Sequence, residues 1–231
     1  SYFGNFYGSA KASSTLDLPA VYPISIKAYL TLNRWDYFRS FATFFEDSRP
    51  SFLVQNEIYL GADVSQPIGN NLKSTVGARV FQLDDSYYQI EDFQNTDTAD
   101  ITSFDGWSAY WKITYNSLNR KQFASSGNYF GFQFCYVNGH ERTQSGSTSL
   151  IPFDIEKNHA WINMRLDFQS FVVVRSFFHL GLHGQVVSNS QTLFANYTAS
   201  LLSMTEFSLI PDANTFRSEE HTSELHSHHD L

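Results

Sequence analysis

Hydrophobic and polar residues alternate along most of the chain. Within 21–33, every second residue is apolar or small, and the residues between them are mostly polar. The first set is Tyr22, Ile24, Ile26, Ala28, Leu30 and Leu32, and the second contains Lys27. Successive side chains of a β-strand point to opposite faces of a sheet, whereas a helix would scatter these residues around its circumference. The segment therefore predicts a strand of about 12 residues with one apolar face.

The same alternation recurs and predicts about eight strands in all. The segments that show it are 2–11, 21–33, 52–64, 72–83, 107–116, 129–137, 160–170 and 174–187. The sequence between them has no amphipathic helical pattern. Strands of soluble proteins typically have about 5–6 residues, so most of these strands are long. The expected fold class is all-β.

The connections between the predicted strands alternate in length. Those at 65–71, 117–128 and 170–174 are short or rich in turn formers, and those at 34–51, 84–106, 138–159 and 188–216 are longer and polar. Short turns at one end and long loops at the other are typical of outer-membrane barrels. Strands of about 9–11 residues also match a tilted crossing of the bilayer. The pattern thus predicts an antiparallel, up-and-down transmembrane β-barrel.

The charged residues of the strands indicate which face would meet lipid. A slip of one residue in register would move them into hydrocarbon, where each Arg or Lys costs about 2–4 kcal/mol at the midplane. The residues predicted to face a wet lumen are Lys27, Glu57, Arg79, Lys112, Arg165, Asp167, His179 and His183. The residues predicted to face lipid are Ile24, Ile26, Leu30, Trp111, Ile113, Phe130, Phe132, Phe134, Leu166, Phe168, Leu180 and Leu182. Aromatic residues near strand ends suit interfacial belts, and these are Tyr22, Trp107, Tyr115 and Tyr136.

Composition narrows the possible functions. Aromatic residues make up 17% of the chain and charged residues 16%, which argues against a disordered protein. The 15 Lys and Arg residues are outnumbered by 23 Asp and Glu, so we expect no nucleic-acid partner. The single cysteine, Cys135, excludes a disulfide within the chain and any C-x-x-C site. A large soluble β-sandwich, whose strands also alternate, is the alternative fold.

The sequence contains few candidates for chemistry. It has no G-x-S-x-G, H-E-x-x-H, P-loop or dinucleotide-binding motif. His179 and His183 lie on the same face of one predicted strand, where a hydrogen-bonded network is favoured over a metal site. Arg165 and Asp167 also share a face and are expected to pair. The acidic stretch 84–105 lacks the spacing of a calcium loop. We therefore expect no cofactor, no metal and no catalytic residue.

The last 15 residues differ from the rest. Residues 217–231 hold four of the eight histidines and no aromatic side chain, and they resemble a translated sequencing adapter. We treat them as an artefactual tail, expected to be disordered. The barrel is then predicted to occupy 1–216. The chain begins with Ser1 in the middle of an alternating pattern, so we expect an internal fragment of a longer protein.

Several short motifs resemble those of one bacterial family. Residues 115–123 (YNSLNRKQF), followed by Gly127, resemble the N-[TS]-L-[ND]-[RK]-[KR]-Q-[YF]-x-x-x-G turn of patatin-like phospholipases that carry a C-terminal outer-membrane barrel. Other similar pieces are 44–47 (FFED), 97–100 (DTAD), 104–106 (FDG), 146–148 (GST) and 196–199 (NYTA). The motifs are moderately specific, and their order along 1–216 carries the resemblance.

The resemblance implies a membrane anchor. In that family an N-terminal patatin domain with a Ser–Asp dyad precedes a barrel similar to the sixteen-stranded Omp85, or bacterial surface antigen, type. Nothing here matches the dyad motifs, so this fragment is not expected to be an enzyme. Its parent would be a lipid acyl hydrolase of the bacterial outer membrane. The implied partners are outer-membrane lipids, the patatin domain and the remaining strands of the barrel.

Two other functions are compatible with the sequence. An Omp85-type assembly or translocation barrel would have POTRA-like repeats upstream in place of a hydrolase. A soluble β-sandwich would have a binding role, such as glycan recognition through its aromatic residues. In either membrane case, we expect that 1–216 does not fold stably alone, because a partial barrel has two unpaired edges that lipid cannot satisfy.

Overall fold

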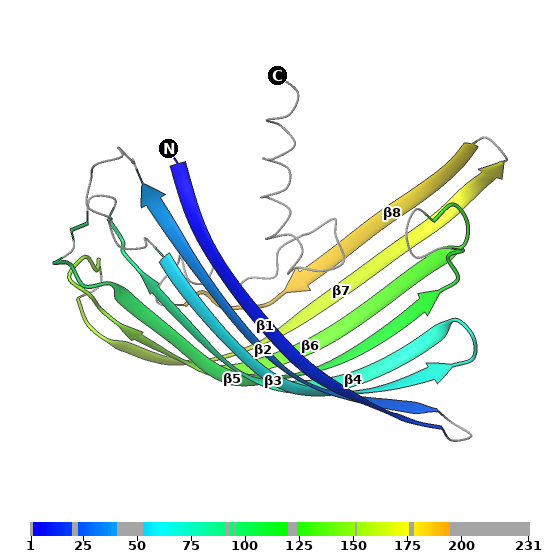
Figure 1. The fold of residues 1–231 in the computed structure, drawn as a ribbon, viewed down its shortest axis with the longest axis horizontal. Helices are drawn as coiled ribbons and strands as arrows, with labels where there is room; N and C mark the ends of the chain where they lie inside the picture. Colours follow the sequence, from blue (N-terminus) through cyan, green and yellow to red (C-terminus); the bar gives the residue numbers. More distant parts are fainter. Residues whose placement is uncertain are drawn as a thin grey trace.

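A computed structural model describes residues 2–19, 23–40, 53–90, 93–94, 96–119, 124–150, 152–175 and 178–194. Eight antiparallel strands form one sheet in sequence order, and no helix occurs among these residues (Figure 1). The strands are β1 (Tyr2–Leu18), β2 (Ile24–Ser40), β3 (Leu53–Ile68), β4 (Leu72–Tyr87), β5 (Asp100–Asn116), β6 (Asn128–Gln144), β7 (Ile155–Arg175) and β8 (Phe178–Asn189). The prediction of an all-β, up-and-down, antiparallel sheet is confirmed.

The sheet bends into a trough and does not close. Each strand pairs with its sequence neighbours, and β1 and β8 are the two edges of the sheet. In Figure 1 the connections lie alternately at the two ends of the trough. Within the described residues no second sheet packs on either face, so the chain lacks the two layers of a β-sandwich. The arrangement is consistent with part of a β-barrel.

The strands are longer than the sequence predicted. Seven of the eight have 16–21 residues, because β1 extends to Leu18, β3 extends to Ile68, and the predicted loops 34–51, 84–106 and 138–159 each contribute strand residues. In these extensions both faces carry polar side chains. On β5, for example, Thr102 lies on one face while Ser103 and Asp105 lie on the other. Hydrophobic alternation is absent there, so the pattern could not reveal the extensions.

The connection between the last two strands also differs from the prediction. Residues 170–174 were expected to form a turn, but they belong to β7, which continues to Arg175 before β8 begins at Phe178. The register shifts between Phe171 and Val173, which marks a β-bulge. The run of apolar residues at 171–174 is better suited to a strand than to a turn, which explains the error.

The buried side chains lie on the inner side of the trough. We call the face that carries Arg79 and Phe104 the concave face, and the face that carries Val76 and Trp111 the convex face. The buried apolar cluster is Leu53, Phe81, Tyr87, Phe104, Cys135, Val137 and Phe194. Gly139 leaves room for it, because a Cβ there would lie 2.5 Å from the Phe104 ring. Curvature thus brings together side chains of neighbouring strands on the concave side.

Candidate functional site

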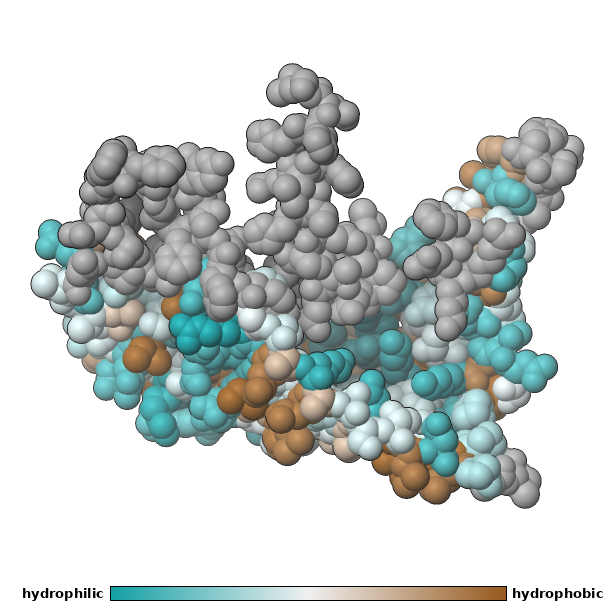
Figure 2. All heavy atoms as spheres, in the orientation of Figure 1, coloured by the Kyte–Doolittle hydropathy of each residue, from teal (hydrophilic) through white to brown (hydrophobic). Residues whose placement is uncertain are grey.

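The convex face is apolar and exposed. Val76 and Leu60 are each 57% exposed and Trp111 is 43% exposed, while Phe104 on the other face is 2% exposed. Figure 2 shows apolar side chains gathered on the underside of the trough, with mostly polar ones toward the end at the left. A soluble protein rarely exposes an apolar surface that extends over a whole sheet. This face therefore requires an apolar environment or a partner.

The register separates the two predicted sets of residues. Neighbouring strands align Val64, Val76, Trp111, Phe134 and Met164 in one row across the convex face. They align Ser65, Thr75, Lys112, Gln133 and Arg165 in the adjacent row on the concave face. All twelve residues predicted to face lipid have convex positions, and all eight predicted to face a lumen have concave ones. Whether lipid and water occupy the two sides stays a prediction.

Two charged groups on the concave face have close partners. The Arg79 Nε donates to Ser108 Oγ at 3.0 Å, and its guanidinium lies 5.1 Å from the centre of the Tyr59 ring. The Arg165 Nε donates to Asp167 Oδ2 at 2.8 Å, which confirms the predicted pair. Asp167 also accepts a hydrogen bond from the Gln185 amide. These contacts fix the direction of both guanidinium groups.

The other predicted concave residues are less constrained. Glu57 accepts a hydrogen bond from Asn33 Nδ2 at 3.0 Å, and Lys27 is half-buried. Lys112 is exposed and has neither an ion pair nor a hydrogen bond in the part of the chain that the structure describes. His179 and His183 are both exposed near the β7–β8 hairpin. No group of three or more His, Cys, Asp or Glu side chains suited to a metal occurs among the described residues.

A buried polar network lies at the long-loop end of the concave face. His159 Nε2 lies 2.6 Å from Glu141 Oε2, and both side chains are fully buried. The other ring nitrogen of His159 lies 2.7 Å from Thr192 Oγ1. Thr143 donates to Glu141 Oε1 at 3.0 Å. Because a buried polar group needs a partner, this network fixes the segment after β8 against the wall of the trough.

The sequence did not reveal this network. His159 and Glu141 both fall in 138–159, which was interpreted as a loop. Their neighbours on the opposite face, His140 and Arg142, are polar too, so no alternation marked the strand. Phe194 packs 4.8 Å from His159 and 5.0 Å from Phe104, measured between ring centroids. Only the tertiary arrangement brings residues 190–194 back onto the sheet.

Two of the motifs that carry the family resemblance contact each other. In 97–100 and 146–148, Ser147 N donates to Thr98 O at 3.0 Å, and Gly146 N donates to Asp100 Oδ1 at 2.7 Å. These bonds join the β4–β5 loop to the β6–β7 loop. In the motif at 115–127, whose residues 120–123 lie outside the described part, Asn119 Oδ1 accepts from Ser125 N at 3.0 Å between β5 and β6. These motifs therefore contribute to loops and turns, whereas the motif 104–106 lies within β5.

Other expectations lie outside the described residues. These are the interfacial position of Tyr22, the motifs 44–47 and 196–199, and the tail 217–231.

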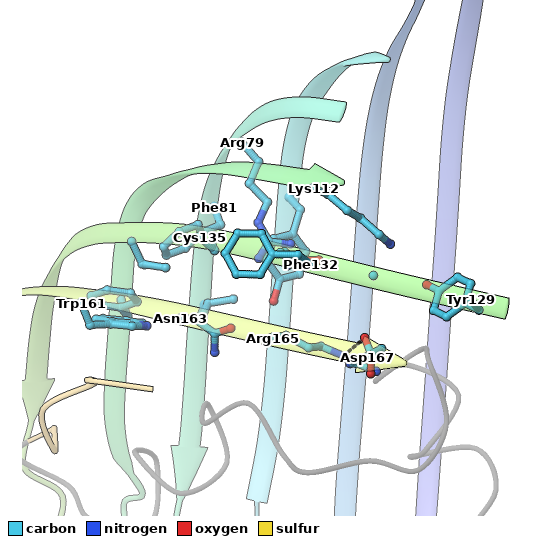
Figure 3. A pocket seen from close by; sticks show the side chains of 16 residues that line it. Arg79, Phe81, Lys112, Tyr129, Phe132, Cys135, Trp161, Asn163, Arg165 and Asp167 are labelled. Carbon is cyan, nitrogen blue, oxygen red and sulfur yellow. Dashed lines mark hydrogen bonds and ion pairs between the residues drawn. The ribbon is translucent and has the colours of Figure 1, made fainter. Parts of the chain in front are cut away.

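A cavity of about 310 Å³ opens on the concave face. Cationic side chains line it on β4, β5 and β7, and Asp167 is the one carboxylate among the described lining residues. Figure 3 shows Trp161 and Phe81 toward one side of the cavity, and Lys112 with the Arg165–Asp167 pair toward the other. A cavity of this size with a few converging polar groups has the general form of a ligand site.

Comparisons with protein-family models, curated proteins and solved structures found no match. No helix among the described residues is long and apolar enough to cross a membrane.

Proposed function

We propose that the chain forms part of the wall of an outer-membrane β-barrel, with its convex face in lipid and its concave face lining an aqueous lumen. The observation that carries the proposal is the exposed apolar band of the convex face, formed by strands whose charged residues at the same level lie on the other face. On β5 this face presents Trp107, Ala109, Trp111, Ile113 and Tyr115 in succession. Lipid would cover such a surface, while the lumen would hydrate the charges.

The height of the apolar band supports a membrane of outer-membrane thickness. From Trp107 to Tyr115 there are eight residue steps of about 3.4 Å, or roughly 27 Å along the strand. At a strand tilt of about 40°, this corresponds to roughly 21 Å along the membrane normal, near the 25 Å band of known barrels. Asp105 is the next convex residue beyond Trp107 and is exposed. The long-loop ends of the strands would then extend beyond the bilayer.

A spin-label experiment tests the two environments. Val76 and Lys112 lie in adjacent rows on neighbouring strands but on opposite faces. Cysteine would replace each in turn, in the protein from the complete reading frame with its other cysteines removed, including Cys135. After reconstitution in phosphatidylcholine, a nitroxide at 76 should collide often with oxygen and rarely with a nickel chelate. A nitroxide at 112 should show the reverse, and a label at Gln82 serves as the control near the interface. Equal nickel access at 76 and 112 would refute the membrane assignment.

We also propose that this wall segment anchors a patatin-like phospholipase. The support is the order of the motifs, three of which have structural roles in turns and loops. The chemistry would then belong to a domain encoded upstream. Sequencing upstream of Ser1 should reveal G-x-S-x-G followed by D-G-[GA] in the same frame. POTRA-like repeats in that place would instead indicate an assembly or translocation barrel, and the anchor proposal would fail.

A further inference from the structure

The cavity on the concave face has two chemically different ends. Lys112 and Arg165 lie in one row across the sheet, with Gln133 between them. Phe81, Phe104 and Trp161 line the cavity further toward the long-loop end of their strands. We call this cavity, whose lining also includes Arg79 and Asp167, the cationic cavity.

The charge of the cationic cavity is unbalanced. Among the described lining residues, three cations face the single carboxylate of Asp167, a formal charge of +2 for these four side chains. Asp167 is already engaged by Arg165, and Arg79 donates to a neutral serine. Lys112 has no partner among the described residues. Like charges that share a cleft repel one another, and an anion seated between them would relieve that repulsion.

At the aromatic end Trp161 is partly exposed to the cavity, whereas Phe81 and Phe104 are 8% and 2% exposed and line it with small parts of their rings. Phe104 stacks on Trp161 with ring centroids 5.4 Å apart, and it lies 5.4 Å from Phe81. Phe194 packs against Phe104, with ring centroids 5.0 Å apart. Arg165 and Trp161 are four residues apart on β7, which corresponds to about 13 Å along the strand. A ligand that bridges the two ends therefore needs a compact anionic head and an acyl or alkyl chain.

We propose that the cationic cavity binds an anionic single-chain amphiphile, with its head at Lys112 and Arg165 and its chain along the partly exposed Trp161 at the aromatic end. The head is a carboxylate or a phosphate monoester. Lys112 supplies three free donors, and the fixed Arg165 guanidinium presents its remaining N–H groups. The inference goes beyond the barrel assignment, since it needs only the concave face.

Calorimetric titration of the complete protein in phosphatidylcholine nanodiscs tests the proposal. The probes are octanoate and octyl phosphate, with empty nanodiscs as the blank. Both should bind saturably, and the tighter of the two identifies the natural source of the head group. Octyltrimethylammonium has the same chain and the opposite charge, and it should not bind. Acetate and inorganic phosphate lack the chain and should bind at least ten-fold more weakly, because the burial of several methylene groups contributes at least that factor to the affinity.

Substitution of Lys112 locates the binding. Lys112→Gln should weaken the binding of either anion roughly 10- to 100-fold, the range expected for loss of a hydrogen bond to a charged group. Lys157→Gln is the matched control. Lys157 lies on β7, is exposed on the concave face like Lys112, and is outside the cavity. It should leave the affinity unchanged. Binding to a site elsewhere in the protein would survive Lys112→Gln, and that result would overturn the proposal.

Three further outcomes would also overturn it. One is the absence of saturable octanoate and octyl phosphate binding. Another is equal affinity for octyltrimethylammonium, since charge would then play no part. The last is equal affinity for acetate or inorganic phosphate, because the aromatic end would then be irrelevant. The spin-label test reports on the two faces of the sheet and the titration on Lys112 and the cavity, so a failed titration with distinct nickel access at 76 and 112 would refute this proposal alone.

Discussion

An arginine introduced in the middle of the apolar band should be far more disruptive than one introduced near its edge. Val76 and Gln82 lie on the same face of β4, six residues apart, and both are exposed. Leu72 and Val80 are the outermost apolar convex residues on β4, and Val76 is midway between them. Val76→Arg and Gln82→Arg therefore introduce the same side chain on the same strand, at two depths.

The separation in depth determines the expected difference. Six residues span about 20 Å along a strand, or roughly 15 Å along the membrane normal at a tilt of about 40°. At the midplane an outward arginine costs about 2–4 kcal/mol, and near the interface about 0–1 kcal/mol. Gln82 already donates to Asp84 at 3.0 Å, and an arginine there keeps that partner. Val76→Arg should thus lower the folding equilibrium constant roughly 30- to 700-fold, and Gln82→Arg less than ten-fold.

Urea titration of the complete protein in phosphatidylcholine vesicles measures this difference. Tryptophan emission follows unfolding, and heat-modifiable migration on a gel confirms the folded state before the titration. If the convex face were in water, both arginines would be surface substitutions with effects within about 0.5 kcal/mol. Equal, small losses of stability at 76 and 82 would therefore refute the assignment of the convex face to lipid.

Three further predictions concern packing, the buried network and the sheet edges. Gly77→Val should destabilise the protein by about 1–3 kcal/mol in the same titration, because a Cβ there would lie 2.6 Å from the Tyr110 ring; no loss would contradict the packing. Glu141→Ala should cost about 1–3 kcal/mol, because it leaves the His159 ring buried without that partner, whereas Glu156→Ala, which removes an exposed carboxylate, should cost less than about 1 kcal/mol. Residues 1–216 alone should show no heat-modifiable migration after refolding in detergent, because the unpaired edges prevent stable folding. A band that shifts on heating would contradict this expectation.

The faces of the sheet were predictable from the sequence because one property repeats along every strand. Ile24, Ile26 and Leu30 need only the period of two to share a face, and Arg165 and Asp167 need only a spacing of two to meet. Such relations within one strand can be predicted without knowledge of the neighbouring strands. The strand extensions escaped prediction because polar residues on both faces remove the alternation, as at His140 and Glu141.

The cationic cavity depends on information that no single strand contains. Arg79, Lys112 and Arg165 come from β4, β5 and β7, and their proximity depends on the register of the strands between them. The sequence predicted the face of the sheet on which each of these residues lies. It did not predict which residues align in a row across neighbouring strands, because turn lengths set the register. The segment 190–194 is a second non-local element. It follows the end of β8, and its Phe194 packs in the buried apolar cluster on the concave face. Adjacency across strands is thus the part of the site that requires coordinates.

The open edges show what the proposed membrane state still requires. β1 is an edge strand of 17 residues and β8 one of 12, and about half of the backbone groups of an edge strand lack a ladder partner. In hydrocarbon each unsatisfied group costs several kcal/mol, so neither edge can face lipid. A lipid-facing convex surface and two unpaired edges are therefore incompatible in the same molecule. If the convex face is in lipid, further strands must pair with β1 and β8, and the concave face then becomes the inside of a closed wall.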